Sequence, residues 1–148
     1  MNLPWVDDII AGLVEIYKTR NIHELYQQLD IEIIKFSKDN ILLRKGEAMY
    51  QRNYFGKEVV FIRDDLEYKY EKFILAHELG HALLHTKIYQ AAYNNKLINK
   101  GKLEKQADYF ALKLLNIKID SIYYEGFTIE QISKALYVNE KSLEVYSI

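Results

Sequence analysis

The sequence predicts an α+β fold in which a small, mainly antiparallel sheet of three strands packs against helices. Apolar residues recur at helical spacing over residues 4–19. Runs rich in β-branched and aromatic residues follow between residues 31 and 63, with turn-forming residues between them. The helical spacing returns from about residue 70. A block of strands with helices before and after it is typical of the α+β class.

The length and composition fit a single domain. The chain has 148 residues, of which 49% are hydrophobic and 28% are charged, and these values are ordinary for a globular domain with one core. Its sequence contains neither repeats nor low-complexity linkers. We therefore expect one domain over residues 1–148, made up of N-terminal helices (1–30), a core (31–116) and a C-terminal helical cap (117–148).

The composition also argues against several classes of protein. A net charge of −1 leaves no basic footprint for nucleic acid or anionic membranes, so no direct nucleic-acid partner is expected. The chain has no Cys, which removes disulfides, thiolate metal ligands and thiol nucleophiles. No apolar run is long enough to span a bilayer, and Asp7 and Asp8 interrupt any signal peptide. These features predict a cytoplasmic protein without membrane association; its oligomeric state does not follow from them.

The first half of the chain divides into two helices and three strands. Pro4 suits the first turn of the helix over residues 4–19. Asn21, with Glu24 three residues later, resembles a capping box that opens a second, short helix. Gly56 lies in a loop between two strand-like runs, which predicts a hairpin. The predicted strands span residues 31–36, 48–52 and 58–63.

The most informative stretch of the chain contains the pattern His-Glu-x-x-His at residues 77–81. On a helix predicted from about residue 70 to residue 85, His77 and His81 lie one turn apart on one face, so two imidazoles can bind one zinc ion from the same side. Glu78 points about 100° away around the helix axis, where it can reach a water molecule at the metal without binding the metal. A chance copy of this short pattern would usually have charged neighbours, whereas the residues around these three are uncharged.

Two acidic residues downstream are candidates for a further metal ligand. Zinc bound by two histidines needs at least one more protein ligand, and without Cys this must be His, Asp or Glu. Residues 101–116 form a predicted helix, with Glu104 and Asp108 one turn apart on one face. An antiparallel neighbouring helix would present Glu104 to the metal. Without the upstream motif, the same two residues would be typical of a solvated face balanced by Lys102 and Lys105.

The two blocks together resemble the ImmA/IrrE family of metallopeptidases, which has a minimal zincin-like core and a gluzincin-like set of ligands. The recurring motifs of that family appear here as His77–His85 and Glu104–Ala111, and the resemblance covers roughly residues 31–116. It departs from the family at residues 114–117, which read Leu-Leu-Asn-Ile where many members read Leu-Leu-Met-Pro. The resemblance implies a Zn²⁺ site with the ligands His77, His81 and Glu104.

The resemblance also implies roles for two residues that do not bind the metal. Glu78 would be the general base of peptide hydrolysis. Asp108 would accept a hydrogen bond from a zinc-bound imidazole, that of His77 in particular, and so fix the orientation and tautomer of the ring. In a zincin-like core, one strand of the predicted hairpin would offer its edge to an extended substrate.

Short members of this family are anti-repressors, so the resemblance implies a function as well. The chain would be a zinc-dependent endopeptidase that cleaves a helix-turn-helix repressor of a phage or mobile element. Two alternatives stay open. The chain would otherwise be a non-catalytic anti-repressor binding protein with a structural zinc, or a DNA-binding regulator that uses its C-terminal helix pair.

Three side chains near the motif have less defined roles. Tyr89 and Tyr93 fall in residues 86–100, a predicted loop or irregular helix over the metal, and each is a candidate oxyanion stabiliser, although packing is the commoner role for such a residue. His85 follows His81 by four residues. Three histidines on successive turns span about 12 Å, too far for one zinc ion with Zn–N bonds of about 2.1 Å. His85 is therefore expected at the helix end or as a hydrogen-bond partner inside the fold.

The C-terminal segment from Thr128 to Tyr146 resembles a helix-turn-helix. A DNA-binding version carries cationic and amide side chains on its second helix. Here that helix carries Glu140, Lys141 and Glu144, which on balance repel phosphate. We therefore expect this helix pair to pack on the core as a cap.

Overall fold

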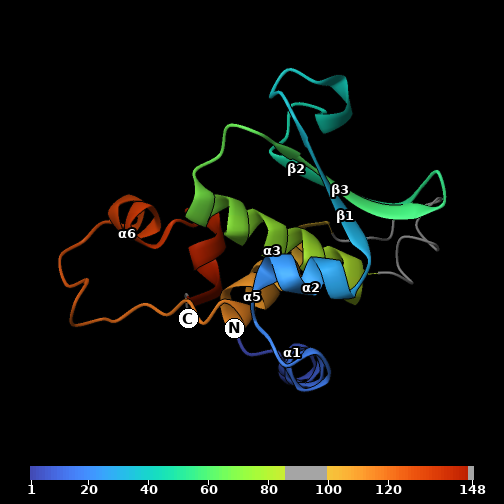
Figure 1. Ribbon diagram of the computed structural model, residues 1–148. Helices are drawn as coiled ribbons and strands as arrows, with labels where there is room; N and C mark the ends of the chain where they lie inside the picture. The colour runs from blue at the N-terminus through green and yellow to red at the C-terminus, as the bar shows by residue number, and fades with distance from the viewer. Residues whose placement is uncertain (86–99, 147–148) are drawn as a thin grey trace.

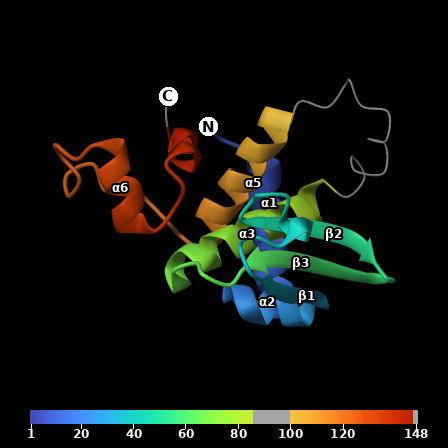
Figure 2. The same ribbon diagram turned by 90° about the horizontal axis from the view of Figure 1, so that it is seen from above.

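The computed structural model describes residues 1–85 and 100–146 and confirms the α+β class. Helix α3 (Tyr68–Leu84) lies at the centre, with the sheet on one side and α5 (Lys100–Leu114) on the other (Figures 1 and 2). The main hydrophobic core lies where these layers meet. The helix that carries the predicted motif is thus held from both sides.

The sheet is mixed, so the prediction of a mainly antiparallel sheet is wrong. Strands β1 (Ile31–Phe36), β2 (Ala48–Tyr54) and β3 (Lys57–Arg63) lie in the order β1-β3-β2. The predicted hairpin is present, since β2 and β3 pair antiparallel, but β1 pairs parallel with β3. Residues 37–47 connect β1 to β2, which lie on opposite sides of β3. The hairpin after β2 reverses the direction of the chain, and β3 then pairs with both β1 and β2. Such an insertion leaves no mark on the alternation of apolar residues within each strand.

The hairpin places β2 at one edge of the sheet. Phe55 and Gly56 form its turn, both with positive φ, of 51° and 81°, as expected for a tight hairpin loop with Gly at the second position. The central strand β3 is buried on both faces: Val60 and Ile62 join the main core, whereas Val59 and Phe61 pack beneath the short 3₁₀ helix η1 (Ile41–Leu43). Only one face of the sheet is therefore covered by α-helices.

Helices α3 and α5 approach each other closely at Gly80. A Cβ atom at this position would lie 3.2 Å from the Cα of Ala107 and 3.2 Å from the Cβ of Phe110. The glycine inside the His-Glu-x-x-His pattern thus lets the backbone of α5 approach the motif helix. This approach brings the acidic residues of α5 within reach of the motif histidines.

The N-terminal helices pack around this pair. Helix α1 (Pro4–Tyr17) begins at Pro4 as predicted, and its Asp7 accepts a hydrogen bond of 2.8 Å from the hydroxyl of Tyr109 on α5. Helix α2 (Ile22–Gln28) is capped by Asn21 as predicted, and its buried Tyr26 donates a hydrogen bond of 2.6 Å to the carbonyl oxygen of Leu75 on α3.

The C-terminal segment differs from the predicted helix-turn-helix. Helix α6 (Ile129–Leu136) has a capping box between Thr128 and Gln131, but the second element is η3 (Lys141–Tyr146), a 3₁₀ helix. The buried residues Leu143 and Val145 of η3 join the main core, and η3 packs on α5. A recognition helix needs more turns and an exposed face. Among the described helices, none is both long and apolar enough to cross a membrane.

Candidate metal centre

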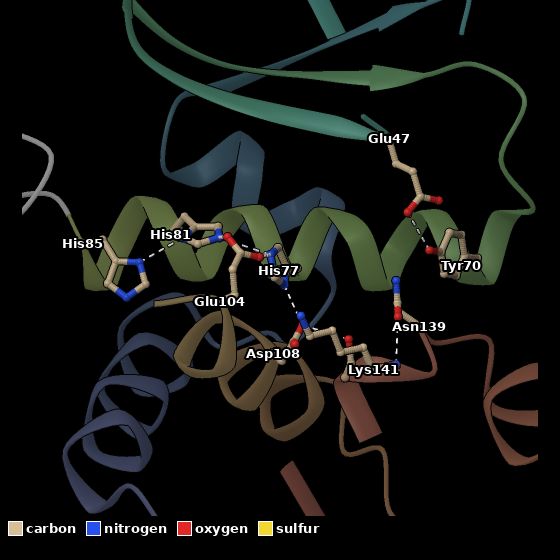
Figure 3. A network of polar contacts seen from close by, with 10 residues as sticks. Glu47, Tyr70, His77, His81, His85, Glu104, Asp108, Asn139 and Lys141 are labelled. Atoms are coloured by element: carbon tan, nitrogen blue, oxygen red, sulfur yellow. Dashed lines mark hydrogen bonds and ion pairs between the residues drawn. The ribbon is translucent and has the colours of Figure 1, made fainter. Parts of the chain in front are cut away.

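Two imidazoles and one carboxylate meet between α3 and α5 (Figure 3). The Nε2 atoms of His77 and His81 lie 3.1 Å apart. The Glu104 carboxylate oxygens lie 3.0 Å from Nε2 of His77 and 2.9 Å from Nε2 of His81. Tetrahedral ligands at about 2.1 Å from a zinc ion are roughly 3.4 Å from one another. The three groups thus have the donor chemistry and nearly the spacing of a zinc site, with the separations a few tenths of an ångström shorter.

The local folding of each helix explains this convergence. His77 and His81 are one turn apart on α3 and their Nε2 atoms face α5. Glu104 lies on the facing side of α5, one turn before Asp108, in the arrangement that the spacing of the sequence predicts. The structure therefore brings together the three residues predicted as ligands.

Asp108 lies beside His77 and not beside His81. Its Oδ1 atom is 2.8 Å from Nδ1 of His77 and accepts a hydrogen bond of 2.9 Å from the hydroxyl of Ser142 on η3. A ring whose Nδ1 proton is held by a carboxylate offers its Nε2 lone pair to a metal. The C-terminal segment therefore takes part in the centre through Ser142, which the sequence does not single out.

The charges of the centre are strongly coupled. Burial acts to lower the pKa of His77, but the hydrogen bonds to Asp108 and Glu104 outweigh this effect and raise the pKa to about 10. Hydrogen bonds from His77 and His81 hold the pKa of Glu104 well below its ordinary value. A metal ion at this centre would have to displace the extra proton from His77, so we expect zinc affinity, measured by chelator competition at several pH values, to increase as the pH rises.

Glu78 faces the sheet edge rather than the ligands of α5. Burial raises the pKa of its carboxyl group, while the positive charges of His77 and His81 oppose the rise. The backbone of Tyr50, on β2, lies beside the Glu78 carboxylate and also acts to lower its pKa. A buried carboxyl group whose pKa is raised suits proton transfer near neutral pH.

A cleft of about 470 Å³ opens beside the centre. Its wall includes Ala48 at the start of β2, together with His77, Glu78 and Glu104. Next to Ala48, Glu47 accepts a hydrogen bond of 2.8 Å from the hydroxyl of Tyr70 on α3, which ties the beginning of β2 to the motif helix (Figure 3). The cleft therefore joins the candidate metal centre to the edge of the sheet.

Ser142→Ala is expected to weaken zinc binding several-fold, because Asp108 loses a donor that holds it against His77. The matched control is Ser133→Ala, since Ser133 is also buried but donates to the carbonyl oxygen of Glu130 on α6. Each variant should lower the free energy of unfolding by about 1 kcal/mol. Competition with a chromophoric chelator measures zinc affinity. Equal zinc affinities of the two variants would contradict this role of Ser142.

A comparison with known proteins identifies the family. A family model described as the IrrE N-terminal-like domain matches residues 26–141. The chain belongs to the ImmA/IrrE family of metallopeptidases. This confirms the resemblance seen in the two sequence blocks. It also extends the matched region beyond residue 116, as far as residue 141 in the C-terminal segment.

Two relatives show how far the likeness to this ImmA/IrrE chain extends. The protein named Metallopeptidase ImmA, from Bacillus subtilis (strain 168), is 31% identical in an alignment of 142 positions that covers 90% of this chain and 77% of the relative. A protein of Bacillus phage phi105 named Uncharacterized immunity region protein 2 is 30% identical over 107 residues, which are 72% of this chain and 65% of the relative.

The structure also places the remaining candidates. His85 ends α3 as its C-cap and forms hydrogen bonds inside the fold, as expected from its spacing. Tyr89 and Tyr93 lie outside the described residues, so their role as oxyanion stabilisers stays a prediction. The hydrogen-bond partner of His85 on α5 is Gln106, which the sequence analysis does not identify. Gln106 lies on α5 between Glu104 and Asp108, and no pattern distinguishes it from a surface residue there.

Proposed function

We propose that this ImmA/IrrE chain is a zinc-dependent endopeptidase in which His77, His81 and Glu104 bind the metal and Glu78 is the catalytic base. The observation that carries the proposal is the convergence of two imidazoles and a carboxylate beside a cleft, in a chain of a metallopeptidase family. Within residues 1–85 and 100–146, three groups converge as ligands, and a set of three protein ligands leaves a fourth position for water or substrate, as in catalytic zinc sites. A structural zinc site would instead be expected to have four protein ligands.

In this proposal, the metal and Glu78 have separate roles in peptide hydrolysis. Zinc, when bound, lowers the pKa of water and polarises a carbonyl group. Glu78 takes the proton from the attacking water as the new C–O bond forms. It then gives this proton to the leaving amine as the C–N bond breaks.

The edge strand β2 is the proposed binding surface for an extended peptide. It lies at the end of the strand order, pairs with β3 on one side, and begins at the wall of the cleft. A substrate strand laid along it would gain main-chain hydrogen bonds, while side-chain pockets would provide the selectivity. The scissile bond would then lie between β2 and the candidate metal centre.

A peptidase implies a protein substrate, and we propose that this substrate is a helix-turn-helix repressor of a phage or mobile element. Support comes from the similarity to a protein named for the immunity region of a phage and to one named ImmA. Cleavage of the repressor would release the genes that it silences, which makes the chain an anti-repressor. No DNA contact by the chain is needed, in keeping with its net charge of −1.

The test is to express the chain together with the repressor encoded beside its gene, using the wild type and Glu78→Gln in parallel. Repressor fragments with the wild type alone are expected, and sequencing of their ends gives the cleavage site. Intact repressor with both chains, but with its genes switched on, would favour a binding protein with a structural zinc. Salt-dependent DNA binding by the purified chain would instead favour a regulator acting through α6 and η3.

A further inference from the structure

We propose that His85 and Gln106 are positioning residues that hold the proton of His81 on Nδ1, so that its Nε2 atom presents a lone pair to the metal. This inference rests on the proposed function, because it assumes that His81 is a ligand. It concerns a different property, namely which nitrogen of each buried ring carries a proton. The three side chains form a hydrogen-bonded relay from α3 to α5, which we call the His81 relay.

The His81 relay has two polar contacts of hydrogen-bond length. Nδ1 of His81 lies 2.9 Å from Nδ1 of His85, and Nε2 of His85 lies 2.9 Å from Oε1 of Gln106. The side chain of His85 points from the end of α3 toward His81 (Figure 3). All three residues are buried, with exposed fractions of 5% for His81, 0% for His85 and 9% for Gln106. Buried polar atoms must satisfy one another where water has little access.

The amide oxygen of Gln106 determines which nitrogen of each ring in the His81 relay carries a proton. The carbonyl oxygen of an amide can only accept, so the proton of His85 must lie on Nε2. A neutral imidazole carries one proton, and Nδ1 of His85 is therefore an acceptor. Nδ1 of His81 must then donate to it, which leaves the Nε2 lone pair of His81 unprotonated. That Nε2 atom is the one that meets His77 and Glu104 at the candidate centre.

The opposite direction would be incompatible with metal binding. If Gln106 turned its amide and donated from nitrogen, Nδ1 of His85 would carry the proton and donate to His81. The proton of His81 would then lie on Nε2, where it would exclude the metal. Metal binding and the orientation of the Gln106 amide are thus coupled through two hydrogen bonds, although Gln106 does not touch the metal site.

The two histidine ligands are held by different chemistry. His77 is held by the carboxylate of Asp108, whereas His81 is held by a neutral ring that is itself held by an amide. If a carboxylate lay beside each of the two histidine ligands, the buried site would hold two negative charges in addition to that of Glu104. A neutral relay orients His81 without a second buried charge, whose desolvation would be costly.

The direct test is the tautomer of each ring in the zinc-loaded wild type. Two-bond proton–nitrogen NMR correlations distinguish protonated from unprotonated ring nitrogens. We expect His85 to carry its proton on Nε2 and His81 on Nδ1. A zinc-loaded chain with the His85 proton on Nδ1 would overturn the relay. This measurement needs no variant, so it does not depend on how well a variant folds.

Two substitutions test the effect of the relay on zinc affinity. His85→Asn keeps an oxygen acceptor near the place of Nδ1, whereas His85→Leu removes it. We expect His85→Leu to weaken zinc binding about 10- to 100-fold and His85→Asn to bind within a few-fold of the wild type. Gln106→Met should let both His85 tautomers appear in the metal-free chain. His23→Leu is the control, because the His23 side chain is partly exposed and lies outside the candidate centre.

Zinc affinity is measured by chelator competition, and thermal unfolding of each metal-free variant shows that it is folded. Equal zinc affinities of His85→Leu and wild type would overturn the relay while leaving the proposed function intact. A wild-type chain that binds no zinc would overturn both. His85→Leu could also lose cleavage while its zinc affinity and the tautomer of His81 stay as in the wild type. That result would overturn a role of His85 through His81.

Discussion

Replacing Glu78 by Gln is expected to lower the turnover number by about 10²- to 10⁴-fold while one zinc ion stays bound per chain. Glutamine keeps the shape of the side chain, but its neutral amide cannot take a proton from water. Because Glu78 is not among the three groups that meet at the centre, the metal affinity should change little.

The measurement for Glu78→Gln pairs metal analysis with the rate of repressor cleavage by purified protein. Glu78→Asp is the useful second variant, because it keeps the carboxylate but withdraws it by one methylene. It should retain more activity than the glutamine variant. Cleavage by Glu78→Gln at the rate of the wild type would show that another group is the base.

His81→Ala is expected to remove zinc at micromolar concentrations and abolish cleavage. A structural zinc site with four ligands has a binding free energy of about 10–16 kcal/mol, so each ligand contributes roughly 2.5–4 kcal/mol, or about 10²- to 10³-fold in affinity. His81 is also buried against His77 and Glu104, so its loss opens a hole that water fills poorly.

The control for this loss is His23→Ala, which changes another of the four histidines of the chain away from the centre. Metal content after gel filtration, with unfolding followed in parallel, separates loss of the site from loss of the fold. Full zinc occupancy in a folded His81→Ala chain would refute the proposed ligand set. The same variant should also lose the increase in thermal stability that zinc gives to the wild type.

Local patterns in the sequence are enough to predict the helices and the members of the centre. One-turn spacing places His77 beside His81 and Glu104 beside Asp108, and the α3–α5 packing at Gly80 then brings the two pairs together. Each of these features depends on residues a few positions apart, which periodicity describes well. The order of the strands depends instead on how residues 37–47 cross the sheet, and alternation within a strand carries no information about it.

The hydrogen-bond partners of the centre could not be predicted in the same way. Ser142 meets Asp108 across 34 positions of the chain, and Gln106 meets His85 across 21. Both are ordinary polar residues whose sequence context suits a solvated surface. Only the packing of η3 and α5 around α3 turns them into buried partners of the motif.

The contact between Ser142 and Asp108 limits how short a functional fragment of this chain can be. A fragment that stops at residue 116 would contain every candidate ligand, yet it would lack the group that steadies Asp108. Such a fragment would serve poorly as the catalytic half of a fusion or a sensor. The minimal unit for transplantation therefore extends through η3, since a cut between α6 and η3 would separate Ser142 from the chain that carries Asp108.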